Sequence, residues 1–209
     1  TSYVVFGKAA GWAADMDLSS LDGLNGFRLD GVDAGDGAGV QTRSAGDVNG
    51  DGYGDVIVGA PKADPDGKSN AGESYVVFGK ASGWSASMNL SALNGSNGFR
   101  LDGVDADDWS GGSVSSAGDV NGDGYDDIII GAFYADPDGK NFAGDSYVVF
   151  GKAHWWSASM NLSSLDGSNG FRLDGVDAND YSGRLVSSAG DVNGDGYGDI
   201  IIGAKGADP

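Results

Sequence analysis

A nine-residue loop rich in carboxylate and amide side chains occurs three times in the chain. Each copy reads DVNGDGY, one variable residue and Asp, so side-chain oxygens stand at loop positions one, three, five and nine. Glycine at position six permits a sharp turn, and the tyrosine at position seven can add its backbone carbonyl oxygen. Hard oxygen ligands without His or Cys select Ca²⁺ over zinc or copper, and Mg²⁺ would take fewer protein ligands. The sequence therefore predicts about three Ca²⁺ ions per chain, held by Asp47, Asn49, Asp51, Tyr53, Asp55, Asp119, Asn121, Asp123, Tyr125, Asp127, Asp191, Asn193, Asp195, Tyr197 and Asp199.

Other loop types explain the pattern less well. An EF-hand needs a bidentate Glu at position twelve followed by a helix, but position twelve is Val58, Ile130 or Ile202. A dockerin-type loop also continues into a helix. The remaining alternative is an Asx-rich turn without an ion. Such a turn would crowd three carboxylates into nine residues, three times over, so we favour Ca²⁺.

The charge balance agrees with a cation-binding protein. The 209 residues include 31 acidic and 12 basic side chains, giving a net charge of −19, and Glu73 is the only glutamate. Short Asp side chains suit turns and metal loops. The acidic excess and the lack of Lys/Arg clusters argue against nucleic-acid partners, and no apolar run is long enough for a membrane span. Because there is no cysteine, redox chemistry does not indicate the compartment. A chain that begins at Thr1 is expected to be processed or partial.

The loops belong to a longer internal repeat. Three different strings, SYVVFGKA, NGFRLDGVDA and AGDVNGDGY, each recur every 72 residues. The first copy is the most diverged, mainly between Gly37 and Arg43. The chain is therefore about three copies of one unit.

Each unit predicts four short strands, exemplified by residues 113–116, 127–132, 146–151 and 171–174. Residues 156–162 form at best one helical turn. Gly-rich turns and almost no helix predict an all-β fold. A four-stranded propeller blade with large loops suits this unit length better than a solenoid coil.

The unit closely resembles the FG-GAP repeat, the blade of the integrin α-subunit propeller and of many bacterial surface proteins. The matching pieces are the three loops, Phe150-Gly151 and Gly59-Ala60-Pro61, whereas Gly131-Ala132-Phe133 and Gly203-Ala204-Lys205 depart at the proline. The resemblance implies a Ca²⁺-stabilised β-propeller that is extracellular, either secreted or on the cell surface, and used in adhesion or ligand recognition. The amino-acid sequence of the repeats is similar to the long FG-GAP arrays of bacterial secreted proteins. No particular partner follows from it.

The family's strand order, in which the metal loop joins the first two strands of a blade, predicts split terminal blades. Residues 1–37 are half a blade, 38–109 and 110–181 are complete blades, and 182–209 are half a blade. Propellers close with about four to eight blades, so three blade-equivalents do not close alone. Either the chain is part of a longer one, or two copies pair as a six-bladed homodimer that completes the split blades.

Several other residues could carry function. Trp12, Trp84 and Trp156 recur with the repeat and are expected to pack between strands or blades, whereas Trp109 and Tyr181 occupy a variable loop position and could stack on a sugar. The strings at 105–108 and 177–180 could form a second cation site, while those at 64–67 and 136–139 suggest turns. His154 is expected to be an exposed loop residue, and Arg28, Arg100 and Arg172 to pair with nearby Asp residues.

These features predict a non-enzymatic Ca²⁺-binding propeller module that acts as an adhesion or structural scaffold. A Ca²⁺-dependent, lectin-like carbohydrate-binding propeller is the alternative function. The ligand could therefore be a protein or a glycan. Glycosidases use two carboxylates, but no acid here stands apart from the repeat pattern as a special pair would. No catalytic residue is therefore predicted.

Overall fold

The computed structural model describes residues 1–208 and shows an all-β chain of fourteen strands in four sheets. This confirms the predicted fold class. No helix in the described residues is long and apolar enough to cross a bilayer. Five single 3-10 turns interrupt the connections: η1 (Leu18–Ser20), η2 (Pro65–Gly67), η3 (Leu90–Ala92), η4 (Pro137–Gly139) and η5 (Leu162–Ser164).

Two sheets contain the four strands expected of a complete blade. One has the order β3 (Gln41–Gly46), β4 (Asp55–Ala60), β5 (Glu73–Val77) and β7 (Gly98–Asp102), and the other the order β8 (Ser113–Gly118), β9 (Asp127–Ala132), β10 (Asp145–Val149) and β12 (Gly170–Asp174). All these neighbours are antiparallel. At the ends of the chain, β1 (Ser2–Val5) pairs with β2 (Gly26–Asp30), and β13 (Leu185–Gly190) pairs with β14 (Asp199–Gly203).

Two further short strands cross from one repeat to the sheet before it. β6 (Ser87–Asn89) pairs in parallel with β2, and β11 (Ser159–Asn161) pairs in parallel with β7. Here the sequence predicted at best a helical turn. The tryptophan that precedes each crossing strand stacks on a phenylalanine of the preceding sheet, Trp84 on Phe27 and Trp156 on Phe99, with ring centroids 4.1 and 4.0 Å apart. This packing holds the connection against that sheet's outer edge.

The hydrophobic core lies between sheets. Alternate side chains of a strand point to opposite faces, so Ile128 and Ile130 of β9 pack toward the β3–β7 sheet while Ile129 packs toward β13 and β14. All three isoleucines are fully buried. A sheet buried on both faces explains why this strand is a continuous apolar run.

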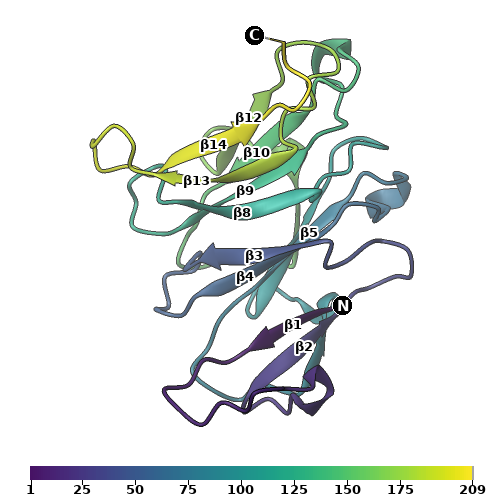
Figure 1. The fold of residues 1–209 in the computed structure, drawn as a ribbon. Helices are drawn as coiled ribbons and strands as arrows, with labels where there is room; N and C mark the ends of the chain where they lie inside the picture. Colours follow the sequence, from purple (N-terminus) through teal and green to yellow (C-terminus); the bar gives the residue numbers. More distant parts are fainter. Residues whose placement is uncertain (209) are drawn as a thin grey trace.

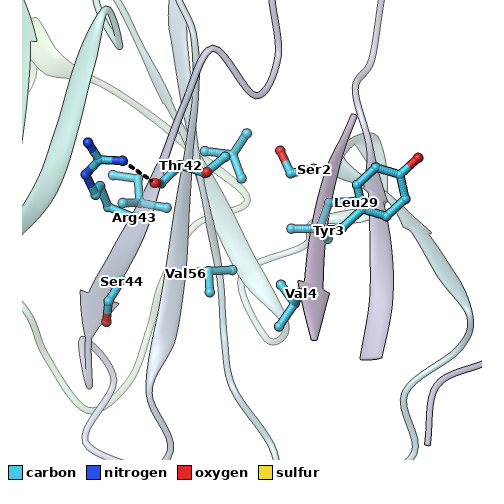
Figure 2. Close-up of a pocket in the computed structure, with 10 residues that line it drawn as sticks. Ser2, Tyr3, Val4, Leu29, Thr42, Arg43, Ser44 and Val56 are labelled. Atoms are coloured by element: carbon cyan, nitrogen blue, oxygen red, sulfur yellow. Dashed lines mark hydrogen bonds between the residues drawn. The ribbon is translucent and has the colours of Figure 1, made fainter. Parts of the chain in front are cut away.

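Figure 1 shows the β1–β2 sheet at the bottom and β3, β4 and β5 above it. The β8–β12 sheet and the β13–β14 hairpin, which overlap in this view, lie in the upper part. A pocket of about 280 Å³ separates β1 from β3 and β4. Ser2 and Val4 point from β1 into this space toward Thr42 and Val56 (Figure 2).

Candidate metal loops

The three Asp/Asn loops connect β3 to β4, β8 to β9 and β13 to β14, and they project on the same side of the molecule, at the left in Figure 1. Each hairpin carries a β-bulge immediately before its loop, as in the register shift between Ser116 and Gly118. A bulge re-aims the chain at the end of a ladder. The fold therefore presents three equivalent loops from equivalent hairpins.

Within each loop the first three oxygen-bearing side chains bind the loop's own backbone. In the second loop, Asp119 Oδ1 accepts hydrogen bonds from the N–H groups of Gly122 (2.7 Å) and Asp123 (3.1 Å), and Oδ2 accepts one from Gly124 (2.9 Å). Asn121 Oδ1 also accepts from the Asp123 N–H, at 2.9 Å. The corresponding side chains of the other two loops make nearly the same set of bonds.

The aspartate at position nine has a different environment. Asp127 is fully buried, and its carboxylate accepts the N–H groups of Val120 and Gly151, both at 2.8 Å. Asp55 binds Val48 and Gly79 in the same way. Burial raises the pKa of both carboxyl groups to about 6, although these backbone donors oppose the shift. Position nine thus fastens the loop to the turn that follows β5 or β10.

This contact gives the Phe-Gly segment a role that sequence reasoning missed. A Cβ atom on Gly151 would lie 2.4 Å from the carbonyl oxygen of Asp126, and one on Gly79 would lie 2.5 Å from that of Gly54. Only glycine lets the turn approach the loop closely enough for its N–H to reach the position-nine carboxylate. The spacing of 24 residues, which is the same between Asp55 and Gly79 as between Asp127 and Gly151, was the available signal.

Successive loops also touch each other. The Tyr125 ring lies against Gly50 of the preceding loop, and the Tyr197 ring lies against Gly122. Asp126, at position eight of the second loop, accepts the N–H of Asp47 at 2.8 Å. The loops therefore form a connected row rather than three isolated turns.

The donor set fits Ca²⁺ by its chemistry: each loop offers three carboxylates, an amide oxygen and backbone carbonyls, with no soft ligand. In the conformation of residues 1–208, however, no three acidic or His side chains are grouped as they would be around a metal ion. Positions one, three and five instead share the loop's backbone donors, and position nine lies in the interior in the first two loops, at Asp55 and Asp127.

The remaining candidate residues take structural positions, apart from an aromatic cluster. Arg28, Arg100 and Arg172 pair with the aspartates two residues further on, at 2.8, 2.5 and 2.6 Å, as predicted. His154 is exposed in a loop. Trp109 and Tyr181 both lie against Tyr134, with ring centroids 5.1 and 5.9 Å away, and Phe142 stacks on Tyr181.

Comparison with known proteins identifies the repeat. The family model of the FG-GAP repeat matches residues 44–77, 110–149 and 182–209. Integrin alpha pat-2 of Caenorhabditis briggsae is 33% identical over 172 residues, covering 76% of this chain and 12% of that protein.

Other similar proteins are integrin alpha-6 of Gallus gallus, which is 30% identical over 159 residues, and phosphatidylinositol-glycan-specific phospholipase D of Bos taurus, which is 30% identical over 161 residues. Each alignment covers 76% of this chain, and the chain spans 12% and 17% of these two relatives. The four-stranded sheets and their Asp/Asn hairpins are thus blades of the β-propeller kind, and the chain belongs to the FG-GAP repeat family.

Proposed function

We propose that this chain is a Ca²⁺-binding part of an extracellular β-propeller that serves adhesion or structural support rather than catalysis. The observation that carries the proposal is the row of three equivalent Asp/Asn loops on one side of the blades. Integrin alpha chains among the relatives support an extracellular, adhesive setting. The phospholipase D relative shares the repeat, so possession of these blades does not by itself separate enzymes from adhesion proteins.

The ions would be held by the loop residues predicted above, about three per chain. Their charge would offset the repulsion among carboxylates in a chain of net charge −19. At free Ca²⁺ about 1,000-fold above the dissociation constant, each independent site would add about 4 kcal/mol to stability. Calcium would therefore act as a stabilising component of the hairpin row.

Calcium titration calorimetry combined with thermal unfolding tests the proposal. We expect about three sites in the unaltered chain, and loss of one site in each of Asp51→Ala, Asp123→Ala and Asp195→Ala, because these position-five carboxylates are exposed and belong to the loops alone. Asp66→Ala, in an exposed turn outside the loops, is the control and should keep every site. Absence of calcium heat together with an unchanged melting temperature in EGTA would contradict the proposal.

Carbohydrate binding is the second candidate function, and the aromatic cluster favours it. Trp109, Tyr134, Phe142 and Tyr181 meet on the loops of the third sheet, whereas the preceding repeat has Gly37, Lys62, Asn70 and Trp109 at these positions. Clustered aromatic faces suit stacking on apolar faces of ligands. A glycan array with Ca²⁺, repeated with Tyr134→Ala, tests this role. Specific glycan binding that Tyr134→Ala abolishes would support it, and an array without hits would exclude it.

The blade division at residues 37, 109 and 181 and the pairing of the split blades are proposals as well. By the repeat, β14 corresponds to β9 and β1 to β10, so the Ile130–Tyr147 pairing predicts Ile202 opposite Tyr3. The β1-type strand would come from a second copy or from a further repeat of a longer chain. Light scattering in Ca²⁺ separates these: twice the chain mass of 21.1 kDa supports the homodimer, and a monomer supports the longer chain.

A further inference from the structure

Two acidic segments that are far apart in the sequence meet in one pocket. The connection from β7 to β8 contributes Asp105 and Asp108, and the connection from β9 to β10 contributes Asp136 and Asp138. Asp145, the first residue of β10, also lines this space of about 360 Å³. The pocket lies between two adjacent sheets and is separate from the Asp/Asn loops.

Asp145 leaves a buried oxygen without a partner. The residue is 3% exposed. Its Oδ2 atom accepts the Tyr147 hydroxyl at 3.3 Å and lies 4.0 Å from Arg172 Nη1, but its Oδ1 atom is buried and accepts no hydrogen bond. Arg172 points its Nε and Nη2 donors at Asp174, at 2.6 and 3.0 Å. The guanidinium group next to Asp145 is therefore largely committed to another carboxylate, and an unpaired buried acceptor is costly.

The preceding blade contains the same arrangement with one side chain changed. Glu73 stands where the next repeat has Asp145. Its longer side chain accepts a short hydrogen bond from the Tyr75 hydroxyl and lies 3.6 Å from Arg100 Nη1. One additional methylene thus brings the carboxylate to both of its intramolecular partners. The chain itself supplies the matched comparison.

The lining of the pocket favours a positively charged ligand. Burial, with a smaller contribution from nearby carboxylates, raises the pKa of Asp145 to about 6 and that of Asp108 to about 7. A bare metal ion does not match this space, because the acidic side chains of residues 1–208 are not grouped for coordination and Ca²⁺ needs six to eight close oxygens. Ammonium and guanidinium groups instead carry directed N–H donors that bind separated carboxylates.

From this geometry we infer that the pocket between Asp108 and Asp145 binds an ammonium or guanidinium group of a ligand. A donor of that group would pair with the free Oδ1 atom of Asp145, and its charge would be shared with Asp108. Such a group occurs on free amines and on Lys or Arg side chains. The inference does not depend on calcium in the loops.

Backbone amide NMR on the whole chain in excess Ca²⁺ tests this site, with methylguanidinium and n-butylammonium as probes. We expect saturable shifts at residues 105–108 and 136–147. Asp145→Glu, which copies the Glu73 arrangement, should weaken binding at least tenfold. The reciprocal variant, Glu73→Asp, should create a second responsive region in the preceding blade. Unaltered amide spectra elsewhere establish that both variants are folded.

Two larger probes distinguish whether the bound ammonium or guanidinium group belongs to a peptide side chain or to a free amine. Tighter binding of N-acetyl-arginine amide than of methylguanidinium supports a peptide side chain, and tighter binding of a diamine supports a free polyamine. No saturable shift with any probe would overturn the inference. So would equal affinity in Asp145→Glu, or loss of probe binding when the Ca²⁺ concentration is raised further.

Discussion

The second and third Asp/Asn hairpins have almost the same sequence but different surroundings. In both, the position-one aspartate accepts the same three backbone N–H groups: Asp191 accepts Gly194 at 2.6 Å, as Asp119 accepts Gly122 at 2.7 Å. The position-nine aspartate differs. Asp127 is fully buried and accepts two N–H groups, whereas Asp199 is half-buried and accepts only that of Val192 among the described residues.

The apolar strands diverge in the same way. Ile129 of β9 is fully buried, while Ile201 of β14 is 59% exposed. The β9 strand has β10 and the β13–β14 hairpin beside it, and β14 is the last strand of its sheet. The loop conformation is therefore a local property of nine residues, whereas burial comes from strands that belong to other repeats.

The largest expected effect comes from removing the position-nine carboxylate. In EDTA, Asp127→Ala should lower the free energy of unfolding by about 3 kcal/mol, because two N–H groups lose their acceptor in the interior. Asp199→Ala should cost less than about 1 kcal/mol, since water can replace its carboxylate. Urea unfolding measures both. Equal losses would mean that the two hairpins share the same environment in solution.

Alanine substitutions at two equivalent glycines, Gly131 of β9 and Gly203 of β14, should show the same difference between the hairpins with a smaller effect on stability. A Cβ atom on Gly131 would lie 2.0 Å from the carbonyl oxygen of Gly183, while on Gly203, its repeat equivalent, the nearest such atom is 3.6 Å away. Gly131→Ala should therefore destabilise by about 2 kcal/mol, because backbone must move. Gly203→Ala should stay within about 0.5 kcal/mol of the unaltered chain. Thermal unfolding distinguishes them, and a stable Gly131→Ala would show that the neighbouring sheets can separate at little cost.

The smallest effect is on the pH dependence of stability. The folded pKa values of Asp108, about 7, and Asp145, about 6, lie above the ordinary Asp value of 3.8. The folded chain therefore binds more protons than the unfolded chain between these values, and stability falls as pH rises through them. Between pH 6 and pH 7 the expected loss is about 1 kcal/mol.

Two variants test which carboxyl groups cause this change of stability with pH. Asp108→Asn, measured in EDTA, should remove the largest single part of it, because Asp55, Asp127 and Asp145, with pKa values of about 6, also lose protons over this range. Asp105, Asp136, Asp138 and Arg172 still face the pocket in this variant. Asp195→Asn, in the exposed loop of the terminal hairpin, should leave the slope unchanged. A slope that falls as much in Asp195→Asn as in Asp108→Asn would contradict the assignment of its largest part to Asp108.

The strands were predictable from the sequence because their signals are local. The apolar run predicted as a strand at 127–132 has the same bounds as β9. The strand predicted at 113–116 is found as β8, which continues to Gly118. The crossing strands β6 and β11 were not predictable, since Ser-Met-Asn is too short to show a strand periodicity. They pair only because an outer sheet edge lies beside them. For the loops, the oxygen pattern was visible, but the anchoring of Asp127 by Gly151 depends on a turn from another strand.

The sequence by itself determined the repeat, the all-β blades and the spacing of oxygen ligands, because these depend on alternation, glycine turns and neighbouring residues. Only the tertiary structure decided which carboxylates find partners. Glu73 and Asp145 differ by one methylene, yet the first reaches both Tyr75 and Arg100 and the second keeps an unpaired oxygen facing acidic loops from two sheets. That outcome depends on distances between segments far apart in the chain, which no local pattern encodes.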